Sequence, residues 1–346
     1  MRFAIRLSVV LSLLAAVSTG CSWVDDDLSD CETEYTLDYE LRLVTNMTAE
    51  LQTQLSLDTD LAVSTALKDY LSNIFTDYAH DVDLGFYDVE EDSVLLYRES
   101  HIMDANQTSY TIFIPVRQYM HLAMANVSRN QELVFRGADY CHRAQLAQQE
   151  TLDTIAPHRA GIFTARLPMD IKEGEDQQFD VSLYMANCAS ALVIDTLGSG
   201  IRDMKVYLGG FATGFNICDS LYRFNDIPPL VRPDRIEVKG STSLCFAAAH
   251  FPSREPEVSK TIIDVDDSST IPEGEDNLWK AWIYVSLPDG TITQNVLGFN
   301  SPIRSGHLKL LKGKVYTNGV VATEDPTVTV SIAIDWVPGL EIPVDL

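Results

Sequence analysis

Cys21 is the residue whose type and position most directly suggest chemistry, because a cysteine thiol at this point can be acylated. Residues 1–20 carry Arg2 and Arg6 near their start, continue with a short apolar run and end with small residues from Ser18 to Gly20. This order is typical of a secretory signal. A cysteine directly after it predicts a lipoprotein signal, cleaved between Gly20 and Cys21, with the lipid on Cys21. The alternative is an ordinary secretion signal followed by a structural cysteine, and Ser18 stands where lipoprotein signals usually carry leucine.

The segment around Cys21 also predicts where the mature chain resides. The apolar run covers residues 7–17, which is shorter than the roughly 20 residues that span a bilayer. We therefore expect residues 1–20 to be a cleaved signal peptide. Residues 21–32 would form a lipidated acidic spacer that contains the run Asp25, Asp26, Asp27. Such charge runs are normally solvated, so the spacer would hold the folded part away from the membrane.

The charge balance excludes several classes of partner. The whole chain has 25 basic and 50 acidic residues, for a formal charge of −25. Cleavage of residues 1–20 removes two arginines, which leaves 23 basic residues and a charge of −27. Nucleic acid and anionic headgroups would be repelled by such a surface. We expect no nucleic-acid partner, and contact with the membrane only through the N-terminal lipid.

Five cysteines remain if the lipid occupies Cys21. Two bridges at most can form among them, and the connectivity does not follow from the sequence. No CxxC pair is present, so neither a zinc ribbon nor a thioredoxin-like site is indicated. We expect most of these cysteines to be small buried apolar residues. They are Cys31, Cys141, Cys188, Cys218 and Cys245.

The search for a catalytic centre finds no motif. The chain contains no GxSxG, HExxH, P-loop or GxGxxG after a strand. The seven histidines are scattered, with no pair four residues apart, and each is expected to be a surface or core histidine. Residues 264–275 match part of a calcium-loop template, but Ser269 replaces its glycine, so an acidic surface loop is the better interpretation. We therefore expect no enzymatic activity, no cofactor and no metal.

Alternating hydrophobicity dominates the chain and predicts a mainly β fold. Apolar residues occur at every second position in four stretches, which are residues 33–44, 110–116, 179–185 and 327–336. This period of two is typical of half-buried strands, and the turn signals between them suit a β-sandwich. We expect an N-terminal β-sandwich domain over residues 33–158 and a C-terminal one over residues 159–346, divided near Pro157.

Two segments depart from this pattern. From Leu61 to Tyr78 the apolar residues follow the three-and-four spacing of an amphipathic helix, with N-cap candidates at residues 58–60. This predicts one amphipathic helix, lying across an end or face of the first domain. A second, weaker helix is predicted over residues 140–150.

The C-terminal segment is the candidate partner-binding site. Its apolar residues alternate with Glu341, Pro343 and Asp345, and a proline restricts such a strand to pairing on one side. The strand either caps its own sheet or adds to a sheet edge of another protein. The alternating residues are Leu340, Ile342, Val344 and Leu346.

Trp279 and Trp282 support a second hypothesis, a surface glycan-binding lipoprotein. Exposed aromatic rings could form a stacking platform for sugars. The two residues are three positions apart in a predicted strand, so they lie on opposite faces and at least one is expected in the core.

Several short motifs resemble those of the fimbrial anchor-subunit lipoproteins of Bacteroidales, the type V pilus system. The resemblance extends over the whole mature chain and begins with Cys21 and the acidic run up to Cys31. Acidic residues after the lipidated cysteine also resemble the signal for export to the outer cell surface in these bacteria. The other similar motifs are Gly85-Phe86-Tyr87, Asp219-Ser220-Leu221-Tyr222 and Asp335-Trp336-Val337-Pro338-Gly339.

The resemblance implies two transthyretin-like β-sandwich domains and a lipid anchor, carrying acyl groups such as palmitate, in the outer membrane. It also implies a structural role at the base of a fimbrium, with a shaft pilin as the partner, and no catalysis. An accessory or tip subunit of the same system is the alternative. In shaft subunits of such pili, a protease removes an N-terminal strand and a neighbour's terminal strand fills the groove. Here the lipid would be lost with that strand, so we expect residues 35–43 to stay in place.

Overall fold

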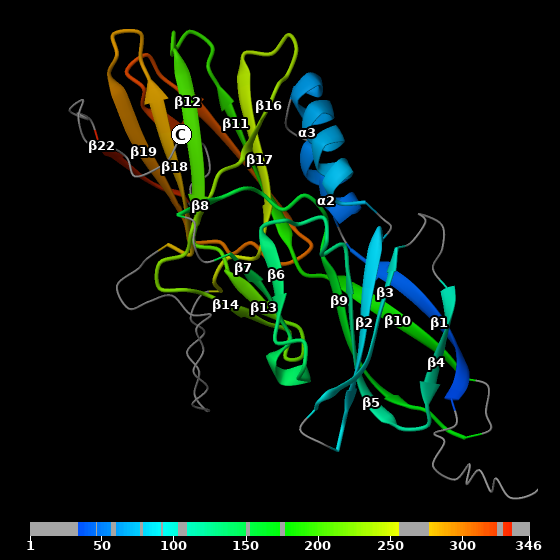
Figure 1. Cartoon of the computed structure of the whole chain (residues 1–346). Helices are drawn as coiled ribbons and strands as arrows, with labels where there is room; N and C mark the ends of the chain where they lie inside the picture. Colours follow the sequence, from blue (N-terminus) through cyan, green and yellow to red (C-terminus); the bar gives the residue numbers. More distant parts are fainter. Residues whose placement is uncertain are drawn as a thin grey trace, which may run out of the picture.

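The computed structural model describes ten stretches of the chain, in which β-strands dominate (Figure 1). The predicted mainly β fold is confirmed. The strands form four sheets, of seven, five, six and four strands, and two α-helices accompany them. The described residues are 34–45, 47–56, 60–76, 79–90, 93–102, 109–149, 153–173, 177–255, 277–323 and 328–333.

The seven-stranded sheet contains β1 (Glu34–Val44), the first described strand, which lies next to the edge strand of this sheet. Alternation sets which side chains this sheet buries: Leu41 is buried, whereas its neighbours Glu40 and Arg42 are exposed. Three predicted strands, over residues 33–44, 110–116 and 179–185, all lie in this sheet. In order across the sheet, the strands are β3 (Leu95–Ile102), β2 (Asp81–Asp88), β5 (Gln118–Ala125), β9 (Phe163–Asp170), β10 (Gln177–Met185), β1 (Glu34–Val44) and β4 (Ser109–Pro115).

Two helices follow β1, where the sequence predicts one. The predicted helix is α3 (Leu61–Ile74), and the Asp60 side chain caps it by accepting a hydrogen bond from the Ala62 amide at 3.1 Å. The additional helix is α2 (Met47–Ser56). It buries a narrow stripe of Met47, Leu51 and Leu55, which recur at every fourth position. The prediction of one helix in this part of the chain therefore missed α2.

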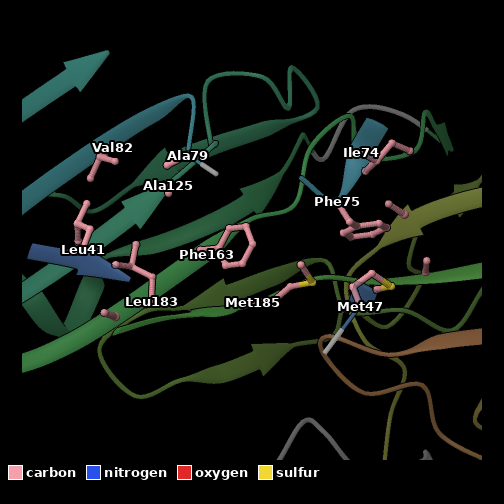
Figure 2. Packing of buried hydrophobic residues seen from close by; sticks show 14 of the residues in the cluster. Leu41, Met47, Ile74, Phe75, Ala79, Val82, Ala125, Phe163, Leu183 and Met185 are labelled. Atoms are coloured by element: carbon pink, nitrogen blue, oxygen red, sulfur yellow. The ribbon is translucent and has the colours of Figure 1, made fainter. Parts of the chain in front are cut away.

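The helices lie between the seven-stranded sheet and the five-stranded sheet (Figure 1). Their apolar stripes belong to the same core as the inner face of the seven-stranded sheet. Figure 2 shows Met47 and Phe75 on the side of this core where Met185 lies. The five-stranded sheet contributes small residues such as Ala247 and Ala249, which let the helices approach its backbone closely.

The five- and six-stranded sheets pack face to face as a β-sandwich with its own core. Trp279 is 1 % exposed in this core, stacked on Phe299 at a centroid separation of 3.8 Å. The five-stranded sheet has the order β16 (Asp234–Ile236), β17 (Ser243–His250), β11 (Cys188–Asp195), β20 (Leu308–Val315) and β21 (Val321–Thr323). The six-stranded sheet has the order β22 (Val328–Ala333), β19 (Ile292–Phe299), β18 (Trp279–Ser286), β12 (Asp203–Gly209), β15 (Leu230–Val231) and β8 (Thr154–Ile155).

A small four-stranded sheet corrects the prediction of a helix over residues 140–150. That stretch forms one 3-10 turn, η2 (Cys141–Arg143), and then a strand. Alanine, glutamine and leucine favour helices locally, but pairing with neighbouring strands on both sides overrides this weak preference. The sheet has the order β14 (Leu221–Arg223), β13 (Gly214–Asn216), β7 (Gln145–Gln148) and β6 (Leu133–Arg136).

The sequence-based boundary between the two predicted domains, at residue 158, does not coincide with the boundary between the sheets. Strands on each side of residue 158 pair with strands from the other side. β9 and β10 lie after this point but belong to the seven-stranded sheet, whereas β8 lies before it and pairs with β15 of the sandwich. Along the chain, the seven-stranded sheet ends with Met185 and the sandwich continues at Cys188. None of the described helices is long and apolar enough to cross a membrane.

Candidate partner-binding site

β1 is the described element nearest to the predicted lipid, and it is held on both sides. It pairs in parallel with β10 over eight residue pairs, from Leu37 with Gln177 to Val44 with Tyr184. On its other side it pairs antiparallel with β4 over seven residue pairs. β1 is therefore an internal strand, and β4 is the strand at the edge of the sheet.

β1 also determines how its neighbours are held. Within the described chain, β4 pairs with β1 and with no other strand. β10 pairs with β9 through two residue pairs only, Tyr184 with Thr164 and Met185 with Phe163. Removing β1 would leave β4 without a neighbour and would open a groove beside β10.

The outward face around β1 combines negative charge with exposed aromatic rings. Glu40 and Asp180 are register partners on β1 and β10, and both are exposed. Phe113 of β4 and Tyr184 of β10 are 59 % and 61 % exposed. Phe113 lies opposite Thr36 and Tyr184 lies opposite Val44, so the two rings are eight register positions apart along β1 and form no continuous patch. Single exposed apolar side chains are common on protein surfaces, and these two do not by themselves mark a contact surface.

A groove along β12 gathers cationic side chains in this acidic chain. Its cavity of about 570 Å³ runs along residues 203–207, between the edges of the two sandwich sheets. Among the described residues, β12 pairs on this side only through Leu208 with Val231. Arg159 pairs with Asp234, and Arg235 pairs with Asp203 at 3.2 Å. Lys205 and Arg232 also line the cavity.

The residues that the sequence predicts to act directly lie outside the described residues. These are Gly20 and Cys21 and the tail residues Leu340, Ile342, Val344 and Leu346. Their roles remain predictions. The predicted acidic surface loop at residues 264–275 also lies outside the described residues. β22, which covers part of the predicted strand at 327–336, is the last described strand and forms an edge of the six-stranded sheet.

Three of the histidines are core residues. Burial lowers the pKa of His121 and of His250 to about 4, and together with the nearby His250 it lowers the pKa of His158 to about 3. His121 Nδ1 lies 2.9 Å from the Gly85 carbonyl oxygen, and His250 Nδ1 lies 2.7 Å from that of Phe251. The neutral rings are part of the packing. In the described stretches, no three His, Cys, Asp or Glu side chains are grouped to hold a metal.

The tryptophan pair gives little support to a sugar-stacking platform. Trp279 lies in the sandwich core, and its Nε1 donates a hydrogen bond to the Ser301 carbonyl oxygen at 3.0 Å. Trp282 is half-buried on the opposite face of β18. The prediction that at least one of the two belongs to the core is confirmed.

Comparison with solved structures identifies the fold. A candidate adhesin from Bacteroides ovatus is 12 % identical, with 89 % of this chain and 97 % of that chain covered and a TM-score of 0.51. A candidate cell adhesion protein from Bacteroides eggerthii is 11 % identical, with 87 % of this chain and 96 % of that chain covered and a TM-score of 0.48. The tip fimbrial protein Mfa3 from Porphyromonas gingivalis is 10 % identical, with 88 % of this chain and 100 % of that chain covered and a TM-score of 0.42.

These comparisons assign a fold and no more than that. The chain shares the fold of the Bacteroides ovatus protein. No protein-family model matches the sequence, and no curated protein matches it.

Proposed function

We propose that the protein is a structural, non-enzymatic subunit of a surface fimbrium that tethers the shaft to the outer membrane through acyl groups on Cys21. The proposal is supported by the signal before Cys21, by the acidic spacer and by the sequence motifs that resemble anchor subunits. The fold shared with a candidate adhesin of Bacteroides ovatus is compatible with it. By occupying the base, the subunit would also end the growth of the shaft.

The observation that carries the proposal is the position of β1. A tether needs a continuous connection from the lipid to the folded body, and β1 begins only a short spacer after Cys21. Backbone hydrogen bonds run across the strands of a sheet. A pull along β1 therefore loads its fifteen register pairs together, eight with β10 and seven with β4, instead of opening them one after another.

The same geometry is the reason to expect β1 to be retained. Cleavage between Cys21 and β1 would separate the lipid from the fold. Loss of β1 itself would leave β4 unpaired and β10 held to the rest of its sheet by two residue pairs. A shaft subunit gains from such an open groove because a neighbour fills it, whereas a tether would lose its attachment.

The contact with the shaft is assigned to the C-terminal tail. With β1 in place, the side of β10 that faces β1 has no open position for a donated strand. The alternating tail residues are Leu340, Ile342, Val344 and Leu346. An added strand gains affinity from main-chain hydrogen bonds and specificity from pockets for every second side chain.

Substitution of Cys21 tests the tether. We expect Cys21→Ala to shed fimbriae into the medium, with overlong shafts, because stable anchoring by acyl chains requires the lipidated residue. Cys31→Ala, ten positions later, is the matched control and should keep fimbriae on the cells. Immunoblots of cell and medium fractions measure the partition, and electron microscopy measures the shaft length. If the Cys21→Ala cells keep fimbriae of normal length, the anchor role is wrong and an accessory or tip subunit takes its place.

Deletion of residues 340–346 tests the contact with the shaft. The truncated protein should stay folded and membrane-bound while the shaft is released, because the deletion leaves the predicted anchor untouched. The control is Glu341→Gln with Asp345→Asn, which keeps the alternating apolar residues. If the truncated protein still holds fimbriae, the tail belongs to its own sheet.

The glycan-binding alternative has a separate test. A glycan binder would be retained on a polysaccharide affinity gel in the absence of any pilin, whereas a fimbrial tether would pass through. The buried position of Trp279 removes one of the two rings on which this alternative depends.

A further inference from the structure

Cys141 and Cys218 face each other in the core beneath the four-stranded sheet. Their Sγ atoms are 3.0 Å apart, and the two residues are 2 % and 9 % exposed. A disulfide requires an Sγ–Sγ distance of about 2 Å, so a shift of about 1 Å would bring the atoms to bonding distance. We infer that the protein carries a Cys141–Cys218 disulfide when it folds in an oxidising compartment.

The backbone on both sides of the pair is already fixed. The Cys141 amide donates to the Ser93 carbonyl oxygen at 2.9 Å, and the Ile217 amide donates to the Ala144 carbonyl oxygen at 3.0 Å. The Asn216 side-chain amide donates to the His142 carbonyl oxygen at 3.1 Å. β13 and β7 then continue as register partners. These hydrogen bonds hold the two segments that carry the sulfur atoms next to each other.

The other described cysteines provide an internal contrast. Cys188 and Cys245 are fully buried, on the neighbouring strands β11 and β17, but neither has a cysteine as a bonding partner among the described residues. Cys188 Sγ contacts His250 instead, at 3.4 Å. The sequence left the connectivity open, whereas the geometry selects one pair.

Formation of the bond is a thiol–disulfide exchange. The co-reactant is a disulfide, either of an extracytoplasmic oxidoreductase or of oxidised glutathione. One cysteine thiolate attacks a sulfur of this disulfide, which forms a mixed disulfide and releases one thiolate. The second cysteine then attacks the first, the S–S bond forms, and the other thiolate leaves. The two cysteines lose two protons and two electrons, and the co-reactant is reduced to two thiols.

Burial determines when this reaction takes place. Desolvation, reinforced by the hydrogen bond with Cys218, raises the pKa of the Cys141 thiol. The folded protein therefore holds little of the Cys141 thiolate that exchange at this sulfur requires. We expect the bond to form during folding, before the core closes around it, and to resist reductants afterwards. It joins residues 77 positions apart along the chain, and long closed loops gain the most from a cross-link.

Peptide mapping of the wild-type full-length protein tests the inference without any substitution. The protein is refolded with oxidised and reduced glutathione, its free thiols are alkylated under denaturing conditions, and it is digested without reductant. We expect one cross-linked species that joins the peptides of Cys141 and Cys218, and alkylated Cys188 and Cys245. Recovery of Cys141 and Cys218 as free thiols, or of either bonded to a different cysteine, would overturn the inference.

Thermal unfolding gives an independent measurement. Unfolding the oxidised protein in the presence of a reductant should lower Tm by about 5–10 °C relative to unfolding without it. The Cys245→Ser variant, which changes a buried cysteine without a partner, should show the same decrease. A variant with Cys141→Ala and Cys218→Ala should show none. An equal decrease in the double variant would assign the effect to another bond and contradict the inference.

Discussion

In the sandwich, the long strands of the six-stranded sheet are joined over nearly their whole lengths: β18 pairs with β19 over eight residues and with β12 over seven. Its short strands β15 and β8 are joined to β12 through a single register pair, Leu208 with Val231. The seven-stranded sheet has one weak seam, between β9 and β10, where two residue pairs join its two parts. On the far side of the seam lie β10, β1 and β4, and β1 provides most of the pairing there.

This difference shows how the two regions depend on the start of the chain. The sandwich draws its strands from residues 154–333, and its core contains none of the residues before Ile155. The seven-stranded sheet is completed only when β1 reaches β10, whose pairing joins Leu37 to Gln177. Such distant pairing is costly in loop-closure entropy. We expect the seven-stranded sheet to be the first region to fail when β1 is damaged.

The largest effect is expected for Leu41→Asp, which places a charge in the core beneath β1. Leu41 is 5 % exposed, and an unpaired buried charge costs about 4 kcal/mol or more. Circular dichroism should show loss of β structure at lower urea than in the wild type. Tryptophan emission is recorded in a background with Trp23→Phe and Trp336→Phe, and it should change later because the two remaining tryptophans, Trp279 and Trp282, both lie on β18. The exposed neighbour provides the control, since Arg42→Ala should change stability by about 0.5 kcal/mol at most. Coincident transitions in Leu41→Asp would show that the two regions unfold as one.

Trp279→Ala reverses the comparison by damaging the sandwich. Loss of the indole removes its stacking on Phe299 and its hydrogen bond to Ser301, at a cost of about 3–5 kcal/mol. Urea denaturation should show the sandwich unfolding first, while β1 still holds the seven-stranded sheet. Trp282→Ala is the matched control, and its half-buried ring should cost clearly less. Equal losses in the two variants would contradict the assignment of Trp279 to the core.

The difference between the regions explains which parts of the fold the sequence could predict. Alternation identified β1, β4 and β10, because each has one face in a core and the other in solvent. It also identified part of β22. The stripe and cap of α3 are local signals of the same kind. The parallel pairing of β1 with β10 leaves no local signal, and for this reason the sequence-based boundary at residue 158 divides strands that share a sheet.

Smaller elements and the candidate site were harder to predict. α2 buries only every fourth residue, and the polar residues between them hide the pattern. β7 has the composition of a helix and depends on its neighbours to be a strand. The Cys141–Cys218 contact and the cationic groove along β12 bring together residues distant in sequence. Cys21 could be proposed from the sequence because the signal that precedes it is local.

Acidification should weaken both regions through their buried histidines. The folded state holds His121 and His250 at pKa values of about 4, against about 6.5 in the unfolded chain. The unfolded state therefore binds more protons between these values. The stabilisation is complete above pH 6.5 and is lost as the pH falls toward 4. From pH 7 to pH 5 the loss is about 2 kcal/mol for each of these histidines. Urea midpoints at both pH values measure it, and equal midpoints would show that the rings are not held neutral by burial.

The smallest effect is expected at the contact between the two regions. Tyr70 of α3 donates its hydroxyl hydrogen to the Asp234 carboxylate of β16, with an oxygen–oxygen distance of 2.6 Å. Burial and this hydrogen bond raise the pKa of Tyr70, so the phenol stays a donor. Tyr70→Phe removes the bond but leaves Asp234 paired with Arg159, so the loss should be only about 1 kcal/mol.

The informative quantity in Tyr70→Phe is the separation between the two unfolding transitions. If α3 couples the regions through this bond, the circular dichroism and tryptophan transitions should move apart in Tyr70→Phe. Lys68→Ala, on an exposed position of the same helix, should leave their separation unchanged. A Tyr70→Phe protein whose transitions move down together would show that the coupling comes from the packing of α2 against β20 and of α3 against β16 and β17. In that case the hydroxyl contributes to stability without contributing to the coupling.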